Sequence, residues 1–282
     1  MKERKYELLL ALLIATRATS FIFNKILLGA MGTMTLLAVR FLITALLMTV
    51  IFPKRVFKMN SSSLLGGLAI GLTFFLVMIS ELSALKTADT SLVSTVEHTS
   101  IILVPVMEAF IVKKLPERNT MIGAFMAFAG IICIGLQQGS LSGSVGLSLL
   151  AAFLYALVII ITDKVTTEKA DPIAIGIVQL AAMGALALVF SLFTEEFSLP
   201  ATPLQWGMLA YLIVVCSAFG FTLTPYAQSH VSVERAGILC AVNPAGAALL
   251  GVVILHEHMG LLGAVGLLLI LGSIIMPYLI KT

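Results

Sequence analysis

Ten long apolar segments, separated by short polar links, constrain this chain more than any other feature. Most of them have close to the ~20 residues that a helix needs to cross about 30 Å of hydrocarbon. Backbone groups in lipid must be satisfied within the segment, and these runs do not alternate as barrel strands do. We therefore predict an all-α membrane protein with ten transmembrane helices. The segments are residues 6–28, 31–52, 64–85, 89–112, 119–137, 144–163, 172–193, 204–227, 234–255 and 260–280.

Composition and motifs exclude several classes of protein. Charged residues make up 11% of the chain, against roughly 25% in a soluble domain. The three cysteines lie in apolar runs without metal-ligand spacing, so we expect no metal site. The net charge of +3 is spread over many links, which does not favour nucleic-acid binding. The sequence has no Walker motif, dinucleotide fingerprint or triad spacing, so we expect neither an enzyme nor a cofactor, and any energy source must be a gradient.

The basic residues predict the orientation of the chain. Thirteen of the 17 Lys and Arg residues fall on the side of the N-terminus if the chain crosses the membrane ten times. Only Lys86 falls in a link on the other side, and Arg17, Lys25 and Arg40 lie within spans. Links rich in Lys and Arg stay in the cytoplasm. We therefore predict a multi-pass protein of the cytoplasmic membrane with both termini cytoplasmic.

The sequence also indicates an internal duplication. The sequence LSGS (141–144) divides two halves, residues 6–137 and 144–280. The first spans end alike, in FNKILL and ITDKVT, and the fourth spans contain Pro105 and Pro244. Five spans per half is an odd number, so the second copy enters the membrane in the opposite direction. Inverted repeats are a common basis of alternating-access transporters, whose substrate site lies near the midplane between the repeats.

Several motifs resemble a known family. The first half contains RATSFIFNK (17–25), an Arg in AVRFLI, ALKTADTSL (84–92) and KKLPE, and the second contains YAQSHVSVERAGIL and NPAGAALLGVVILHEH (243–258). This plan resembles the drug/metabolite transporter superfamily, in particular its ten-helix EamA group. The resemblance implies two EamA-type domains, a cavity lined by the first, third and fourth helices of each half, and transport of small metabolites. The chain departs from the usual pattern at Arg17, where an aromatic residue is common, and at Glu97–His98.

Charged side chains within the spans are candidates for the site, because such residues usually face the bundle interior and often mark a transport path. Arg17 lies mid-span and shares a helical face with Ser20 and Asn24, three and seven residues further on. We expect Arg17 to contact substrate or a gate, the alternative being a structural ion pair. Glu81 lies in the outer part of its span and is either functional or a carboxylate of the outer rim.

Glu97 and His98 are neighbours in the fourth span. Successive helical residues differ by about 100°, so the two side chains cannot point at one spot. At least one of them is expected to serve substrate binding or proton coupling. The alternative is a structural pair with Arg17, Lys25 or Arg40.

The second half offers fewer polar residues. Tyr155 stands where a cavity aromatic would lie and could offer its ring to a cation, or else packs in the core. Tyr226 and Asn243 are further candidates, because Pro244 frees a carbonyl one turn earlier that could line a cavity. Glu257 in LHEHMG lacks the spacing of a zinc site, so a capping role is expected.

These patterns favour a secondary active transporter for a small polar or amphipathic metabolite, with an amino acid preferred as substrate. Proton coupling through Glu97, His98 or Glu81 is a further hypothesis. Amines and other organic cations are the alternative substrates. An intramembrane enzyme and a non-transporting scaffold are the alternatives from other classes. The expected partners are the substrate, the lipid bilayer and coupling protons, without nucleic acid, and both a monomer and a homodimer stay open.

Overall fold

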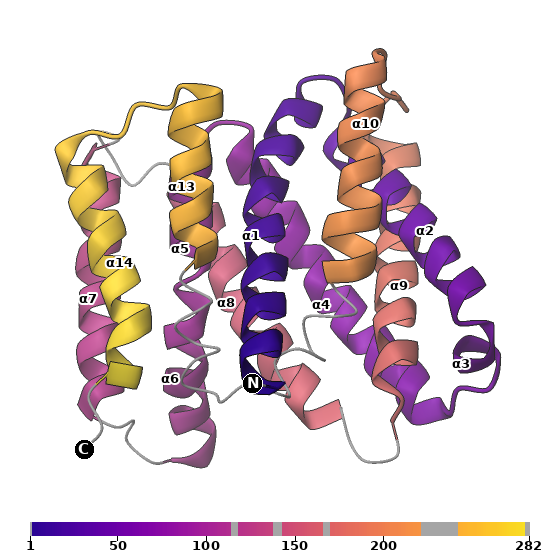
Figure 1. Cartoon of the computed structure of the whole chain (residues 1–282), viewed down its shortest axis with the longest axis horizontal. Coiled ribbons are helices and arrows are strands. Elements are labelled where there is room, and N and C mark those ends of the chain that lie inside the picture. Colours follow the sequence, from indigo (N-terminus) through magenta and orange to yellow (C-terminus); the bar gives the residue numbers. More distant parts are fainter. Residues whose placement is uncertain (1, 114–117, 138–142, 166–169, 221–241, 280–282) are drawn as a thin grey trace.

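The computed structural model describes residues 2–113, 118–137, 143–165, 170–220 and 242–279, and every regular element among them is a helix. Figure 1 shows these helices side by side in one bundle. The all-α class predicted from the sequence is therefore confirmed. In chain order the helices are α1 (Lys2–Leu28), α2 (Thr33–Ile51), α3 (Pro53–Phe57), α4 (Ser61–Leu85), α5 (Thr90–Glu97), α6 (Ser100–Val112), α7 (Arg118–Gln137), α8 (Gly143–Val165), α9 (Pro172–Thr194), α10 (Pro203–Tyr211), the π-helix η1 (Leu212–Phe219), α13 (Val242–Leu255) and α14 (Leu261–Leu279).

Many of the helices have the length and apolarity of membrane spans. In the described ranges, five are long and apolar enough to cross a bilayer, and five shorter apolar helices accompany them. Large apolar side chains face outward along these helices; Leu46, for example, is 65% exposed and Phe125 71%. A surface of this kind suits a lipid environment and not water. The five spanning helices are Leu8–Leu28, Thr33–Ile51, Ser61–Leu85, Gly143–Thr162 and Pro172–Thr194.

Helices from the two parts of the sequence pack against each other. Helix α2 packs against α9, α7 against α14, α4 against both α8 and α9, and α13 against both α1 and α5. Small residues permit the closest approach. A Cβ atom added at Gly67 of α4 would lie 2.6 Å from Val178 of α9, and one at Gly71 would lie 2.8 Å from Ala182. Close packing of this type is typical of helices in membranes.

The predicted span 89–112 is two helices instead of one. Helix α5 ends at Glu97 and α6 begins at Ser100, so the break falls at His98 and Thr99. Side chains compete for backbone carbonyls there: the Thr99 hydroxyl donates to the Val96 carbonyl at 2.7 Å, and His98 Nδ1 lies 2.6 Å from the Ser94 carbonyl. The expectation of one continuous helix over this segment was therefore wrong.

A second irregular element interrupts the predicted span 204–227. Helix α10 passes into the π-helix η1 over Leu212–Phe219. Short π-helical turns are rare and often occur at functional sites. This one packs against α1 and α2, which carry Arg17 and Arg40.

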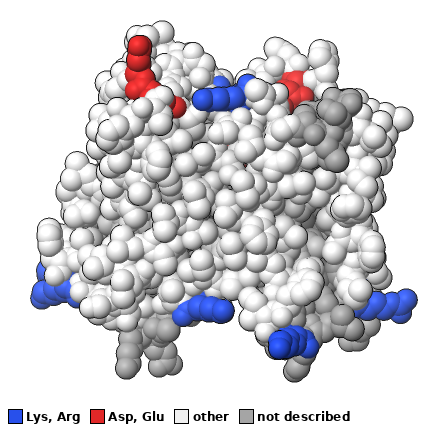
Figure 2. Space-filling model, turned by 180° about the vertical axis from the view of Figure 1, so that it is seen from behind, with Lys and Arg blue, Asp and Glu red and all other residues white. Residues whose placement is uncertain are grey.

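Charge is distributed unevenly between the two ends of the bundle. Helix α1 begins and α14 ends at the lower end in Figure 1, whereas α5 begins and α13 ends at the upper end. Figure 2 shows most of the visible Lys and Arg side chains along the lower end, whereas the acidic side chains lie at the upper end, where a basic side chain is also visible. The band between the two ends shows no charge on this face, as a membrane-embedded surface requires.

Candidate functional site

Arg17 of α1 reaches across to α8 in the interior. Its Nη1 donates a hydrogen bond to the Tyr155 hydroxyl at 3.2 Å, and its guanidinium carbon lies 5.9 Å from the centre of the tyrosine ring. The ring is also held edge-on by Phe74 of α4, with centroids 5.5 Å apart. Arg17 stays partly exposed, unlike the other charged groups around it. It is therefore a cation held in place by an aromatic partner.

Arg40 of α2 is more deeply buried and fully engaged. Its Nε donates to the Ser217 hydroxyl in η1 at 2.8 Å, and its Nη1 donates to the side-chain oxygen of Asn24 at 3.1 Å. Both Arg40 and Asn24 are almost inaccessible. Arg40 thus ties α1, α2 and the π-helix together.

Two carboxyl groups meet beside these arginines. Glu81 of α4 and Glu97 of α5 are each 3% exposed, and their carboxyl groups lie close enough to interact electrostatically. Both acids are near enough to Arg17 to interact with its charge. The Oε2 atom of Glu97 is buried without a hydrogen-bond partner. A buried acceptor without a partner is costly, which makes this atom a candidate for substrate or proton binding.

His98 contacts α13 and α1. Its Nε2 lies 2.9 Å from the side-chain nitrogen of Asn243, and Phe21 packs against its ring with centroids 6.3 Å apart. If Asn243 donates to Nε2, the proton of a neutral His98 lies on Nδ1, where it can donate to the Ser94 carbonyl. The Asn243 side-chain oxygen is then left buried and unpartnered, as is the Ser100 hydroxyl.

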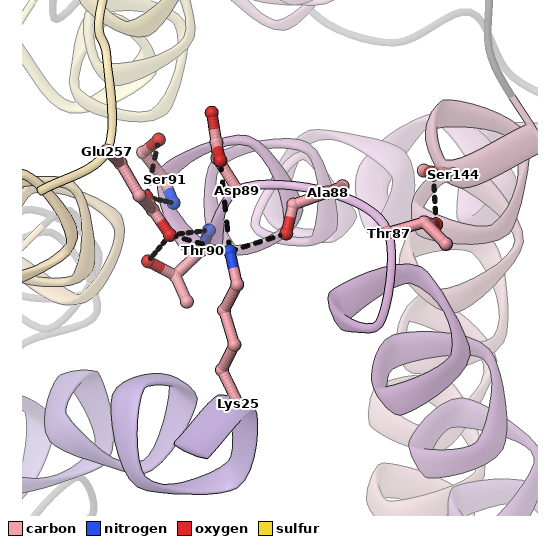
Figure 3. A network of polar contacts seen from close by, with 8 residues as sticks. All are labelled: Lys25, Thr87, Ala88, Asp89, Thr90, Ser91, Ser144 and Glu257. Atoms are coloured by element: carbon pink, nitrogen blue, oxygen red, sulfur yellow. Dashed lines mark hydrogen bonds and ion pairs between the residues drawn. The ribbon is translucent and has the colours of Figure 1, made fainter. Parts of the chain in front are cut away.

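A second polar cluster lies at the upper end of the bundle and is drawn in Figure 3. We call it the Glu257 clamp; it comprises Lys25, Asp89, Thr90, Ser91 and Glu257. Glu257 accepts hydrogen bonds from the backbone N–H and hydroxyl of Thr90, at 2.7 and 2.8 Å, and from those of Ser91, at 3.2 and 3.3 Å. The Lys25 ammonium lies 2.9 Å from Glu257, 3.8 Å from Asp89, and donates to the Ala88 carbonyl at 2.9 Å.

Helix electrostatics explain why the Glu257 carboxylate lies at the start of α5. The first N–H groups of a helix have no partner within the helix and attract negative charge. Glu257, which lies in the link between α13 and α14, supplies that charge to the start of α5, as the capping expectation implied. Burial acts to raise the pKa of Glu257, but hydrogen bonds from the Thr90 N–H and from Lys25 outweigh it, so the pKa of Glu257 lies below its ordinary value. Partial burial and the charge of Glu257 raise the pKa of Asp89.

The predicted candidates are distributed as follows. Arg17, Glu81, Glu97 and Asn24 come together with Arg40, and we call this group, with Tyr155, His98, Asn243 and Ser217, the central polar network. Ser20 is half-buried and hydrogen-bonds to none of the described residues. Tyr226 lies outside the described residues. Within the described part of the chain, neither Glu97 nor His98 forms an ion pair with an Arg or Lys side chain.

Sequence reasoning missed Ser217 and the partners of Lys25. Nothing in the sequence marks Ser217 among the other small residues of its apolar segment. Lys25 stands at the end of the first span beside Asn24, a position that favours an ion pair near the surface, but its partner Glu257 is too far along the chain for spacing to reveal the contact.

A multi-pass helical membrane protein with a charged interior is the class that this fold and these residues define. The sequence matches the EamA-like transporter family twice, over residues 4–136 and 143–279. The chain therefore belongs to the EamA-like transporter family, which confirms the resemblance seen in the sequence. The protein is a membrane transporter, and its family points away from an enzyme.

Relatives and a solved structure agree with this assignment. An uncharacterized transporter of Archaeoglobus fulgidus is 28% identical over 277 residues, covering 93% of both chains. The uncharacterized transporter YetK of Bacillus subtilis is 24% identical over 65% of this chain and 58% of its own. A protein crystal structure aligns with a TM-score of 0.67 over 98% of this chain and 96% of its own, at 19% identity. That likeness concerns the fold alone.

Proposed function

We propose that the protein is a secondary active transporter with ten membrane-spanning helices in two inverted repeats, residues 6–137 and 144–280. The directions of the first helix of each repeat support this plan. Figure 1 shows α1 running from the lower to the upper end and α8 running the opposite way. In agreement, Ser144 at the start of α8 hydrogen-bonds to Thr87, at the upper end, at 2.8 Å. The pairs α2 with α9 and α7 with α14 each join corresponding helices of the two repeats.

The central polar network is the observation that carries the proposal. Its members come from α1, α2, α4 and α5 of the first repeat and from α8, η1 and α13 of the second. Charges at this depth are costly and persist where they serve a path or a ligand. The break between α5 and α6 falls at the network, and discontinuous helices of this kind form the midplane sites of many transporters. Relative movement of the repeats would expose the network to each side in turn.

A zwitterionic amino acid is the substrate that suits the network best. Arg17, which forms no ion pair with the described residues, offers a partner to a carboxylate, and the unpartnered Oε2 of Glu97 offers a partner to an ammonium group. An organic amine is the second candidate, because Glu81, Glu97 and the Tyr155 ring all lie near Arg17 in the interior, and carboxylates and aromatic rings attract cations.

Proton coupling is supported by the proximity of Glu81 and Glu97 in the interior. Two neighbouring buried carboxyl groups repel each other when both are ionised, so we expect at least one of them to hold a proton. Substrate binding that separates them, or that supplies an ammonium group to Glu97, would release that proton. We propose this exchange as the coupling step.

The charge distribution supports an orientation in the cytoplasmic membrane. The basic lower end in Figure 2 would face the cytoplasm, which places the start of α1 and the end of α14 there. The Glu257 clamp would then lie at the outer face. Because it joins the end of α1, the start of α5 and the α13–α14 link, it would hold the outer end of the pathway closed.

The proposal is tested with purified protein reconstituted in liposomes. A thermal-shift screen of amino acids and amines at two pH values first selects the ligand, and its labelled form is then offered under an imposed pH gradient. We expect gradient-driven uptake by the wild type, loss of uptake in Arg17→Gln, and uptake that no longer responds to the gradient in Glu97→Gln. The surface variant Arg118→Gln is the control. Uptake equal to that of empty liposomes for every ligand selected would contradict the proposal.

A further inference from the structure

A cavity of about 340 Å³ opens near the lower end of the bundle, away from the central polar network. This volume lies within the ~300–1,000 Å³ range of small-molecule pockets. The link between α2 and α4, which contains the short helix α3, forms one wall, and the start of α9 forms the other. The cavity is lined by Lys54, Arg55, Lys58, Asn60, Ser63 and Asp171, among others.

The cavity carries uncompensated positive charge. Its one acid, Asp171, is already occupied: one oxygen lies 2.9 Å from Arg55 Nη1, and the other accepts from the first N–H groups of α9 at Ile173 and Ala174. Lys54 and Lys58 form no ion pair with any of the described residues. Two ammonium groups therefore face an open cavity without a counter-charge, which favours an anionic ligand.

Apolar surface adjoins this charge. Val50 and Ile51, at the end of α2, are 70% and 54% exposed, and Phe57 of α3 is 81% exposed. Helix α3 buries none of its side chains and lies toward the end of the bundle where Figure 2 shows the Lys and Arg side chains. An aromatic residue beside basic residues at the end of a membrane helix is typical of the lipid headgroup level. A ligand here would meet positive charge at one end and an apolar wall at the other.

We propose that this cavity binds the phosphate headgroup of an anionic phospholipid, with Lys54 and Lys58 contacting the phosphate and the acyl chains lying along Val50, Ile51 and Phe57. Basic pockets between membrane helices recognise acidic headgroups in this way. The proposal goes beyond transport, because the site holds a component of the surrounding bilayer and shares no residue with the central polar network.

Native mass spectrometry of the full-length protein in detergent tests the assignment, using phosphatidylglycerol and phosphatidylcholine with matched acyl chains. The wild type is expected to bind phosphatidylglycerol more tightly, and the variant Lys54→Gln/Lys58→Gln to lose about tenfold of that affinity. The variant Lys113→Gln/Lys164→Gln removes two exposed lysines from the same end of the bundle and is expected to bind as the wild type does.

Three results would overturn the proposal. One is equal affinity for the two lipids, and a second is an equal loss in both double variants, which would indicate a diffuse charge effect. The third concerns soluble glycerol 3-phosphate: if it binds as tightly as the lipid and with the same dependence on Lys54 and Lys58, the site serves a free phosphate. All four positions are exposed, so the variants are expected to fold, and the binding is measured without any transport substrate.

Discussion

Removing the carboxylate of Glu257 is expected to destabilise the protein strongly. The side chain is 4% exposed, makes four hydrogen bonds to the start of α5 and pairs with Lys25 at 2.9 Å. Breaking a buried ion pair by removing one partner costs about 3–5 kcal/mol. Because the Lys25 side chain is 27% exposed, solvent screens part of this pair, and we expect Glu257→Ala to lower the free energy of unfolding by about 3 kcal/mol. Glu257→Gln, which keeps one acceptor oxygen, should lose roughly half as much, since a hydrogen bond to a charged group is worth about 1.5–3 kcal/mol.

Reversible unfolding of the purified protein by detergent or denaturant measures these changes. A double-mutant cycle with Lys25→Met isolates the pair, and a coupling energy of about 1–3 kcal/mol is expected. Glu196→Gln is the matched control, because that acid is exposed. The effect should also depend on pH. Because the folded state lowers the pKa of Glu257, its carboxylate contributes its full stabilisation above the ordinary value of 4.5. That stabilisation is lost as the pH falls through the lowered pKa. A loss below about 0.5 kcal/mol in Glu257→Ala at pH 7 would refute the reasoning.

Three further predictions concern stability and are checked by the same unfolding measurement. The raised pKa of Asp89 means that the folded state disfavours its ionised form. Asp89→Asn should therefore stabilise the protein slightly at pH 7 and have no such effect below pH 3.8. A lower free energy of unfolding at pH 7 would contradict this. Gly251→Ala should cost about 1–3 kcal/mol, because its Cβ would overlap the clamp carboxylate. At Gly176 an added Cβ atom would meet open space, so Gly176→Ala should be neutral or stabilising by up to about 1 kcal/mol. Equal changes in stability for Gly251→Ala and Gly176→Ala would contradict both predictions. Ser217→Ala removes an acceptor of the buried Arg40 and should cost about 1.5–3 kcal/mol; an unchanged stability would mean that Arg40 finds another partner.

Hydropathy was sufficient to predict the helices that run unbroken. The apolar segment 31–52 corresponds to α2 (Thr33–Ile51), and 172–193 corresponds to α9 (Pro172–Thr194). Both begin at turn residues and are apolar along most of their length, so length and composition determine their bounds. The resemblance in the motifs also predicted the family, because motifs of both halves carry it.

Hydropathy could not predict where a helix is broken. The break at His98 and Thr99 depends on side-chain bonds to carbonyls of the preceding turn, and neither residue lowers the average hydropathy of the segment enough to reveal it. Helical periodicity did suggest that Glu97 and His98 would face different neighbours. It could not identify Glu81 and Asn243 as those neighbours, since they come from other helices.

The partners of the interior charged residues could not be predicted from the sequence either. A buried Arg predicts that a partner exists, but the partner is set by packing between distant parts of the chain. Arg17 meets Tyr155, and Arg40 meets Ser217 in the π-helix, whose irregular turn has no sequence signature. Glu257 was expected to cap a helix, and the helix that it caps lies in the other half of the sequence.

Substrate counterflow in proteoliposomes tests the central claim most directly, because it requires a substrate site that opens to each side in turn. Liposomes loaded with unlabelled substrate are diluted into trace labelled substrate, and transient accumulation of label is recorded without any ion gradient. We predict accumulation by the wild type and by Arg118→Gln, and at least a tenfold loss in Arg17→Gln. Counterflow by Arg17→Gln at the wild-type rate, with unchanged half-saturation, would contradict a substrate site at the central polar network.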